Sequence, residues 1–135
     1  MIDFRTAAQQ AAAAVGDAVE RAIATAYAEY DKALRRCNAF DFDDLIVRPV
    51  QLFLDEPEVR EHYAGRFLHV LVDEFQDTNS IQMRFIELLA GMHGNLFVVG
   101  DDDQSIYGWR GARIENILDF DSQFPEAQVI RLEQN

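Results

Sequence analysis

An apolar run that ends in carboxylates is the feature that most limits what this chain can fold into. The stretch "FLHVLVDEFQDTN" covers residues 67–79, and Asp73 and Glu74 come directly after its largely apolar first part. A short run of this kind is typical of a strand that is covered on both faces. "NLFVVG", residues 95–100, is a second such run, and Asp101 follows it. The sequence therefore predicts two buried strands with acidic residues at their carboxyl ends.

The elements around these strands predict the fold class. A helical apolar pattern fills residues 79–94 between the two strands, we expect another helix at about 113–122, and "QVIRLEQ", residues 128–134, is typical of a third strand. Strands that alternate with helices indicate an α/β fold with a parallel sheet and crossover helices. With 135 residues and 49% hydrophobic content, the chain suits one compact domain.

A helical segment precedes the α/β part. Residues 6–36 are rich in alanine and glutamine, and their larger apolar residues recur every three or four positions, which predicts one long amphipathic helix. The residues on this stripe are Val15, Val19, Ile23, Tyr27, Tyr30 and Leu34. Asn38 suits the left-handed position that ends such a helix.

Two shorter helices are expected before the first strand. Asp41 or Asp43 can cap a helix, although Pro49 should bend or end it. The apolar residues of this helix are Leu45, Ile46, Leu52 and Phe53. Pro57 is a favoured first helical residue, so a further short helix should begin there.

The acidic strand ends raise a question of charge. In an open parallel sheet, ligands bind beyond the carboxyl ends of the strands, so the acids that follow both strands should share one edge. Like charges in such proximity favour a divalent cation, and Mg²⁺ with several waters and a substrate phosphate is the usual one. The alternative is that these carboxylates cap the helices that follow them. Both interpretations stay open from the sequence.

Composition excludes several other classes. The net charge of −12 argues at first sight against a nucleic-acid partner, and the acidic excess lies in residues 37–135. Cys37 is the only cysteine and the three histidines lack metal-ligand spacing, so neither a disulfide framework nor a zinc site is expected. No apolar run approaches the roughly 20 residues of a membrane span, and the N-terminus lacks a signal-peptide pattern. We therefore expect a cytoplasmic protein with no membrane partner.

An aromatic loop is the second unusual stretch. "SIYGWRG", residues 105–111, sets Tyr107 and Trp109 among glycines and beside Arg110. An exposed Tyr and Trp next to an Arg would form a stacking platform for single-stranded nucleic acid. The alternative is a pair of core aromatics, but Gly108 and Gly111 favour a loop.

These motifs together resemble a known family. "LVDEFQDTN" and "VVGDDDQSIYGWRGA" resemble motifs II and III of the superfamily-one DNA helicases of the UvrD/Rep/PcrA type, and "RLEQN" resembles the opening of their motif IV. "FDFDDLI" is similar to the segment that precedes motif II. The resemblance implies that residues 38–135 form a partial RecA-like ATPase domain. Residues 1–37 would then belong to the accessory subdomain inserted into that domain.

The resemblance also implies roles for single residues in the hydrolysis of ATP. Asp73 corresponds to the Walker B aspartate that holds Mg²⁺ through water, and Glu74 to the base that positions the water attacking the γ-phosphate. Gln104 would sense that γ-phosphate. ATP and Mg²⁺ are the cofactors implied.

The same resemblance places the aromatic loop on DNA. Tyr107, Trp109 and Arg110 would lie on the single-stranded DNA side, with the Trp109 ring stacked on a base. The partners implied are single-stranded DNA and duplex junctions, in DNA unwinding, repair or replication.

Departures from the family pattern limit what this chain is expected to do alone. A phosphate-binding loop GxxxxGK[ST] is missing, since the only lysine, Lys32, lies in the alanine-rich helix. Asn135 is reached before the arginine that follows "LEQN" in the family, and the second RecA-like domain lies outside the sequence. We therefore expect one wall of an ATP pocket that is inactive alone and needs the remainder of the helicase. The alternative is a non-enzymatic helicase remnant or interaction module. A phosphoacceptor receiver domain is disfavoured because it needs a lysine near a late strand.

Overall fold

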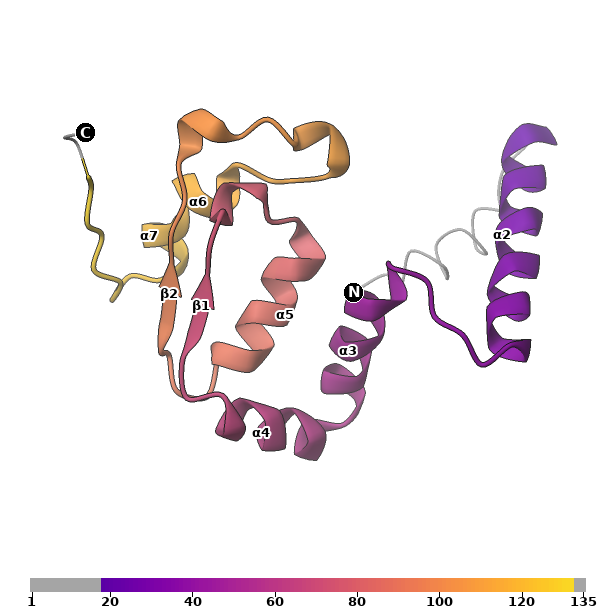
Figure 1. The fold of residues 1–135 in the computed structure, drawn as a ribbon, viewed down its shortest axis with the longest axis horizontal. Helices are drawn as coiled ribbons and strands as arrows, with labels where there is room; N and C mark the ends of the chain where they lie inside the picture. The colour runs from indigo at the N-terminus through magenta and orange to yellow at the C-terminus, as the bar shows by residue number, and fades with distance from the viewer. Residues whose placement is uncertain (1–17, 133–135) are drawn as a thin grey trace. The chain divides into compact units, whose positions relative to one another are not determined.

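The computed structural model describes residues 18–132 of the chain, and these fall into two compact units (Figure 1). Of the described residues, 18–45 belong to the first unit and 46–132 to the second. We expected a helical segment to end at residue 37 and an ATPase domain to begin at residue 38. The division into compact units does not test this assignment. Each unit is described by itself below.

The first unit contains α2 (Ala18–Arg36), which confirms a helix in this region. The helix ends where expected, because Asn38 adopts a left-handed conformation with φ of 49°. Asp31 is buried, and its Oδ2 accepts a hydrogen bond from Arg35 Nε at 2.8 Å. Val19 and Ile23 of the predicted stripe are exposed. Residues 6–17, including Val15, lie outside the described residues.

Helix α3 (Asp44–Asp55) begins with a reciprocal pair of aspartates. Asp41 Oδ1 accepts from the Asp44 N–H at 2.8 Å, and Asp44 Oδ2 accepts from the Asp41 N–H at 3.3 Å, so Asp41 provides the cap. The expectation that Pro49 would bend or end the helix is wrong in one respect, because α3 continues to Asp55. Burial of Val50 and Phe53 beyond the proline outweighs the hydrogen bond lost at its nitrogen.

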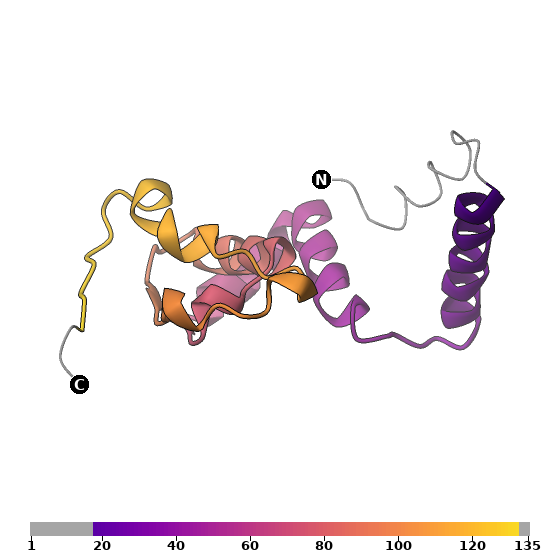
Figure 2. The ribbon, with the colours of Figure 1, turned by 90° about the horizontal axis from the view of Figure 1, so that it is seen from above.

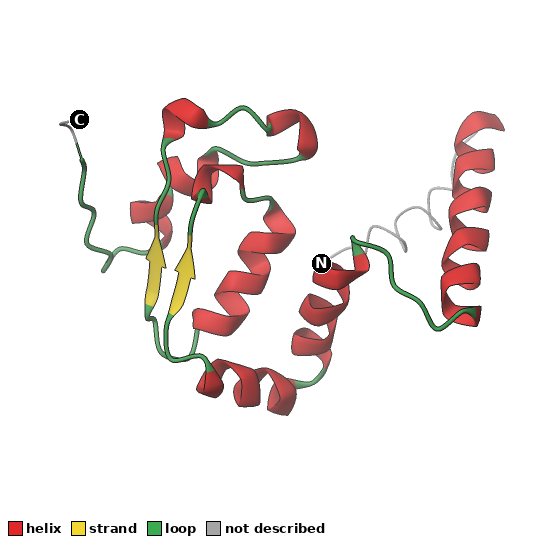
Figure 3. Ribbon diagram, viewed as in Figure 1, coloured by secondary structure: helices red, strands yellow, loops and turns green. Residues whose placement is uncertain are grey.

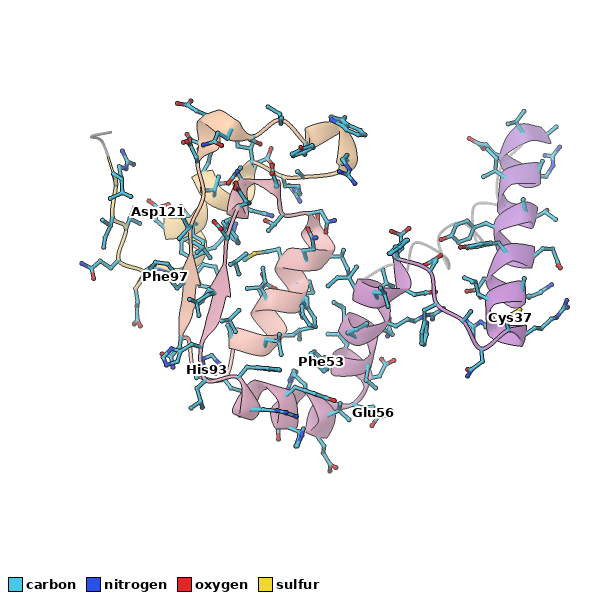
Figure 4. The ribbon with its side chains drawn as sticks, in the orientation of Figure 1. Cys37, Phe53, Glu56, His93, Phe97 and Asp121 are labelled. Atoms are coloured by element: carbon cyan, nitrogen blue, oxygen red, sulfur yellow. The ribbon has the colours of Figure 1, made fainter. Side chains whose placement is uncertain are left out.

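Helix α4 (Pro57–Arg66) starts at the predicted proline. Glu56, labelled in Figure 4, precedes it without a side-chain capping bond. Val50 and Phe53 of α3 form an apolar cluster with Leu88 of α5 (Ser80–Ala90), against which partly buried residues of α3, α4 and α5 pack. Phe53 also stacks on Phe85, with ring centroids 5.7 Å apart.

The sheet consists of two parallel strands among the described residues, β1 (Val70–Val72) and β2 (Leu96–Val98). Val70 pairs with Leu96 and Val72 with Val98, which confirms the parallel arrangement. Helix α5 makes the crossover between them, and Figure 3 shows this strand, helix, strand unit. The Asn79 side chain accepts from the N–H groups of Ile81 and Gln82 in a capping box that starts α5.

Residues 18–132 cover only one face of this sheet. Phe75, Met83 and Ile86 form the buried centre of the covering layer, and alternate strand residues pack against it together with residues of α6 (Glu115–Leu118) and α7 (Phe120–Gln123). Figure 2 shows the ribbons of these elements from above. On the other face Leu71 is 72% exposed and Phe97, labelled in Figure 4, is 59% exposed. The expectation that both strands are covered on both faces is therefore wrong for the residues described.

The C-terminal part differs from expectation in two ways. The helix predicted at about 113–122 forms as two short helices, α6 and α7, divided at Asp119. The predicted third strand is not formed in residues 128–132, which run as a loop (Figure 3) with Val129, Ile130 and Leu132 exposed. A strand needs a neighbour to pair with, and the described residues offer this segment none.

Candidate functional site

Two loops meet at the carboxyl edge of the sheet. The β1 loop, residues 73–79, follows β1, and the β2 loop, residues 101–112, follows β2 (Figure 1). Backbone hydrogen bonds continue the pairing past the strands, from Val99 N to Val72 O at 2.8 Å and from Phe75 N to Val99 O at 2.9 Å. The prediction that the acidic groups after both strands share one edge is confirmed.

Asp73 and Glu74 project from a sharp turn at the end of β1. Glu74 has φ of 50°, one of two non-glycine residues with positive φ among the residues described. This left-handed conformation costs roughly 1–2 kcal/mol for an L-residue. The Asp73 Oδ1 accepts from the Glu74 N–H at 2.9 Å, which ties the turn together. Both side chains are exposed.

The buried part of the β1 loop holds that turn in place. Phe75 is fully buried, and its ring meets Phe120 edge to face at 5.5 Å between centroids. Gln76 is 1% exposed. Its Nε2 donates to Glu74 Oε2 at 2.7 Å, and its Oε1 accepts from the Asp101 N–H at 3.1 Å. One amide side chain therefore bonds to the ends of both strands.

The acids that follow β2 are engaged differently. Asp101 caps the short 3-10 helix at Asp102–Gln104, since its Oδ1 accepts from the Asp103 N–H at 3.1 Å. Its Oδ2 accepts from the Gln104 side chain at 2.7 Å. For Asp101 the capping interpretation is therefore correct. Gln104 lies exposed at the same sheet edge as Asp73 and Glu74.

The carboxylates do not assemble into a complete metal cage. Among residues 18–132, no group of three or more His, Cys, Asp or Glu side chains is arranged to hold a metal ion. Mg²⁺, however, usually keeps several waters and takes one or two carboxylates plus substrate phosphates. Asp73 fits that donor set, because its side chain is exposed and only its Oδ1 accepts a hydrogen bond within the part of the chain described.

The aromatic residues of the β2 loop face solvent. Trp109 is 80% exposed, so the alternative that it is a core aromatic is wrong. Tyr107 is partly exposed, and the Arg110 guanidinium carbon lies 5.6 Å from the Trp109 ring centroid and 5.8 Å from that of Tyr107. Gly111 adopts φ of 89°, which closes the short 3-10 helix Gly108–Arg110. The loop presents an open aromatic surface with a cation beside it.

The far end of the β2 loop is bound to the β1 loop. Thr78 O accepts from the Arg113 N–H at 2.9 Å and from the buried Asn116 side chain at 3.1 Å. Asn116 Nδ2 also lies 3.0 Å from Thr78 Oγ1, and Asn79 pairs with Ala112 in an isolated antiparallel bridge. The β2 loop is thus attached to the β1 loop at both ends, with its aromatic middle free.

Sequence reasoning missed three residues of this arrangement, namely Gln76, Thr78 and Asn116. A glutamine two positions after an exposed glutamate carries no local signal that it will be buried. Threonine and asparagine in or near loops are ordinary turn residues. Only the long-range contacts show their role.

Lys32, the single lysine, is engaged in α2. Its ammonium donates to Glu29 Oε1 at 2.7 Å, and this hydrogen bond and charge lower the pKa of the Glu29 carboxyl from its usual value. The pairing agrees with a lysine on a helix surface.

No helix among the described residues is both long and apolar enough to cross a membrane.

The described residues form an α/β unit whose two strands are parallel, with an acidic loop and an aromatic loop at the carboxyl edge of the sheet. Residues 3–125 match the UvrD/REP helicase N-terminal domain, and the chain belongs to this family. It is 52% identical over 120 residues to DNA helicase II of Salmonella typhimurium and to DNA helicase II of Escherichia coli. It is 54% identical over 113 residues to the ATP-dependent DNA helicase PcrA of Staphylococcus aureus.

These relatives are much longer than the aligned region. The match covers 89% of this chain but 17% of each DNA helicase II, and 84% of this chain but 16% of PcrA. The chain thus spans about a sixth of the length of these relatives. It corresponds to part of a UvrD/PcrA-type N-terminal domain.

Proposed function

We propose that this chain is a segment of an ATP-dependent DNA helicase that supplies the carboxylates for ATP hydrolysis and a loop that contacts single-stranded DNA. The observation that carries the proposal is the shared edge of the sheet. Exposed Asp73 and Glu74 follow β1, and the loop that bears exposed Trp109 follows β2. The residues for ATP hydrolysis and those for DNA contact would then lie on two loops that follow neighbouring strands of one sheet.

Each carboxylate has a distinct task in this proposal. Asp73 holds Mg²⁺, and the ion when bound neutralises charge on the phosphates of ATP. Glu74 orients the attacking water and accepts its proton at Oε1, because Oε2 already accepts from Gln76. Gln104 hydrogen-bonds the γ-phosphate after leaving Asp101. Phosphoryl transfer needs positioning and charge stabilisation more than covalent help, and these side chains provide positioning.

The DNA contact in this proposal depends on the open aromatic surface. Trp109 stacks on a base, Tyr107 supports it, and Arg110 contacts a backbone phosphate. Stacking is tolerant of sequence because every base has a π-face, which suits a protein that moves along single-stranded DNA towards a duplex junction. The net negative charge of the chain is compatible with this role, because in this proposal the DNA contact depends mainly on aromatic stacking and less on charge.

The rest of the ATP pocket would come from residues outside this sequence. A phosphate-binding loop with its lysine and a second RecA-like domain with its arginine complete the site in this proposal, and we call a chain that contains all of these the complete helicase. The complete helicase would act on cytoplasmic DNA. The 135-residue chain alone should turn over ATP more slowly than about 1 s⁻¹, the low end of ordinary enzyme rates, even with excess single-stranded DNA and Mg²⁺. Faster turnover would contradict this part of the proposal.

The test is steady-state ATP hydrolysis by the complete helicase with and without single-stranded DNA. Glu74→Gln should lower the rate by about 10²- to 10⁴-fold while nucleotide still binds, because general base catalysis is worth that much. Asp73→Asn should raise the Mg²⁺ concentration needed for half-maximal rate. Glu87→Gln is the matched control, since Glu87 only pairs with Arg84 at 2.8 Å on the surface of α5. If Glu74→Gln and Asp73→Asn both behave like this control, the two residues are only turn residues and the proposal is wrong.

A further inference from the structure

We propose that Gln76 is a positioning residue that orients the Glu74 carboxylate and fixes it to the first residue of the β2 loop. The inference rests on the proposed function, because it assigns Glu74 the role of base. It adds a residue that does not touch nucleotide and whose action passes through Glu74 and Asp101.

The first ground is that both polar atoms of the Gln76 side chain are hydrogen-bonded. Its side chain is 1% exposed, it donates to Glu74 Oε2 at 2.7 Å, and it accepts from the Asp101 N–H at 3.1 Å. A buried amide without partners would cost roughly 1–3 kcal/mol, so its orientation is set by these two bonds. The donor must point to Glu74 and the acceptor to Asp101, since a carboxylate accepts and an N–H donates.

The second ground is the conformation of Glu74. Its backbone is left-handed and its side chain is exposed, so packing does not hold the carboxylate. The Gln76 amide is the partner that the structure gives the Glu74 carboxylate among the described residues. A base that must meet a water within hydrogen-bond reach gains from such a restraint, because a misplacement of about 1 Å can cost 10²-fold in rate.

The third ground is Gly100, which leaves space for the Gln76 side chain. A Cβ on Gly100 would lie 2.6 Å from Gln76 Oε1 and 2.9 Å from the Ile117 Cδ1. Any larger residue at position 100 would therefore displace the amide or the side chains around it. The close approach of the β2 backbone to Gln76 connects the position of Glu74 to the start of the loop that carries Gln104 and Trp109.

The experiment compares two Gln76 variants in the complete helicase at saturating ATP, Mg²⁺ and single-stranded DNA. Gln76→Glu keeps the shape and an acceptor for the Asp101 N–H but sets a carboxylate against Glu74. Gln76→Met keeps a similar volume and removes both hydrogen bonds. We expect kcat to fall by about 10- to 100-fold in both, more in Gln76→Glu because like charges repel, while the Kd for nucleotide stays within about twofold. Gln82→Met is the matched control, since Gln82 Oε1 accepts from the Asn79 N–H at 2.9 Å and only caps α5.

Thermal unfolding of the same samples separates positioning from packing. If Gln76 only stabilises the fold, the variants lose Tm but keep the wild-type kcat in their folded population, and the proposal is overturned. Should both variants fail to fold, Gly100→Ala provides the second approach, with Gly65→Ala as control because Gly65 is exposed on α4 and a Cβ there meets nothing within 4 Å. Gly100→Ala should lower kcat at unchanged nucleotide Kd, and wild-type kcat in a folded Gly100→Ala protein would equally overturn the proposal.

Glu74→Gln is assayed in parallel to separate this inference from the proposed function. If Glu74→Gln retains activity, the proposed function fails. If Glu74→Gln is inactive and the Gln76 variants are as active as Gln82→Met, the proposed function stands and the positioning role alone is wrong.

Discussion

The β1 loop and the β2 loop occupy the same edge of the sheet but are built in opposite ways. In the β1 loop, Phe75, Gln76 and Thr78 are buried. Asp73 and Glu74 are exposed, and the other two residues of the loop are half-buried. In the β2 loop almost every side chain is exposed, and Trp109 is the extreme case. The β1 loop therefore holds the Glu74 carboxylate in one position, whereas the β2 loop presents exposed side chains that can adjust to a partner.

Under the proposed function, each loop suits a different task. Phosphoryl transfer would depend on placement within fractions of an ångström, which a rigid strand and a buried turn can supply. Base stacking would tolerate variation in geometry, so its residues could project from a loop that is held at its two ends.

The largest effect is expected from Phe75 when the same truncation is made in both loops. Phe75→Ala should lower the free energy of unfolding by about 3–5 kcal/mol, because it removes a fully buried ring that contacts Phe120. Trp109→Ala should change it by no more than about 0.5 kcal/mol, because the ring is exposed. Urea denaturation of this chain, followed by far-ultraviolet circular dichroism, measures both. Equal losses would show that the two loops do not differ as described.

Trp109→Ala should matter for DNA instead. Stacking of a base on an aromatic ring contributes about 1–3 kcal/mol, so single-stranded DNA should bind the complete helicase roughly 5- to 150-fold more weakly. Trp109→Phe retains a ring and should recover part of the affinity. Fluorescence anisotropy of a labelled oligonucleotide measures this at fixed salt. Wild-type affinity in Trp109→Ala would rule out the stacking role.

Thr78→Val tests the attachment of the β1 loop to α6, which follows the β2 loop. Thr78 Oγ1 donates to Phe75 O at 2.7 Å and lies 3.0 Å from Asn116 Nδ2, so loss of the buried hydroxyl should cost about 1 kcal/mol. Thr25→Val is the matched control, since the Thr25 hydroxyl also donates to a backbone carbonyl, at 2.8 Å, but on an exposed helix surface. The midpoint of urea denaturation should fall for Thr78→Val and stay nearly constant for Thr25→Val. The reverse order would mean that the attachment is unimportant.

The smallest effect is expected from Arg110. If the guanidinium contacts a phosphate, Arg110→Gln should weaken DNA binding alike for all sequences and reduce the salt slope by up to about one counterion. Trp109→Ala should leave that slope nearly unchanged because no charge is removed. Anisotropy titrations across a series of salt concentrations give both slopes. An unchanged slope in Arg110→Gln would assign Arg110 to the aromatic side chains beside it rather than to DNA.

Sequence patterns predicted those parts of the fold that depend on local chemistry. The left-handed Asn38, the helix start at Pro57 and the parallel pairing of the two apolar runs are confirmed because each follows from local conformation or from the alternation of elements. The sequence predicts that Pro49 bends or ends α3, and the helix does not end there, since the burial that compensates for the proline involves a distant helix.

Burial and long-range pairing were beyond what the sequence signals. Leu71 and Phe97 lie in apolar runs of the kind found in strands that are buried on both faces, yet both side chains are exposed. Whether a strand is buried depends on the elements that pack on it, and the sequence of the strand does not specify these. The candidate site was predicted as a set of residue types at one edge. The amide of Gln76 that joins Glu74 to Asp101 was not, because the contact spans 25 positions.

The large sequence separation of these hydrogen-bond partners determines when the site forms during folding. The bond from Asp101 to Gln76 closes 25 residues, and the bond from Asn116 to Thr78 closes 38. Contacts between residues so far apart in sequence form only after the intervening chain has collapsed, because loop closure costs entropy before the contact rewards it. Neither loop can therefore mature alone. The amide hydrogens of Asp101 and Arg113 should exchange with solvent through one common opening event, so that the edge of the sheet is acquired and lost as a unit.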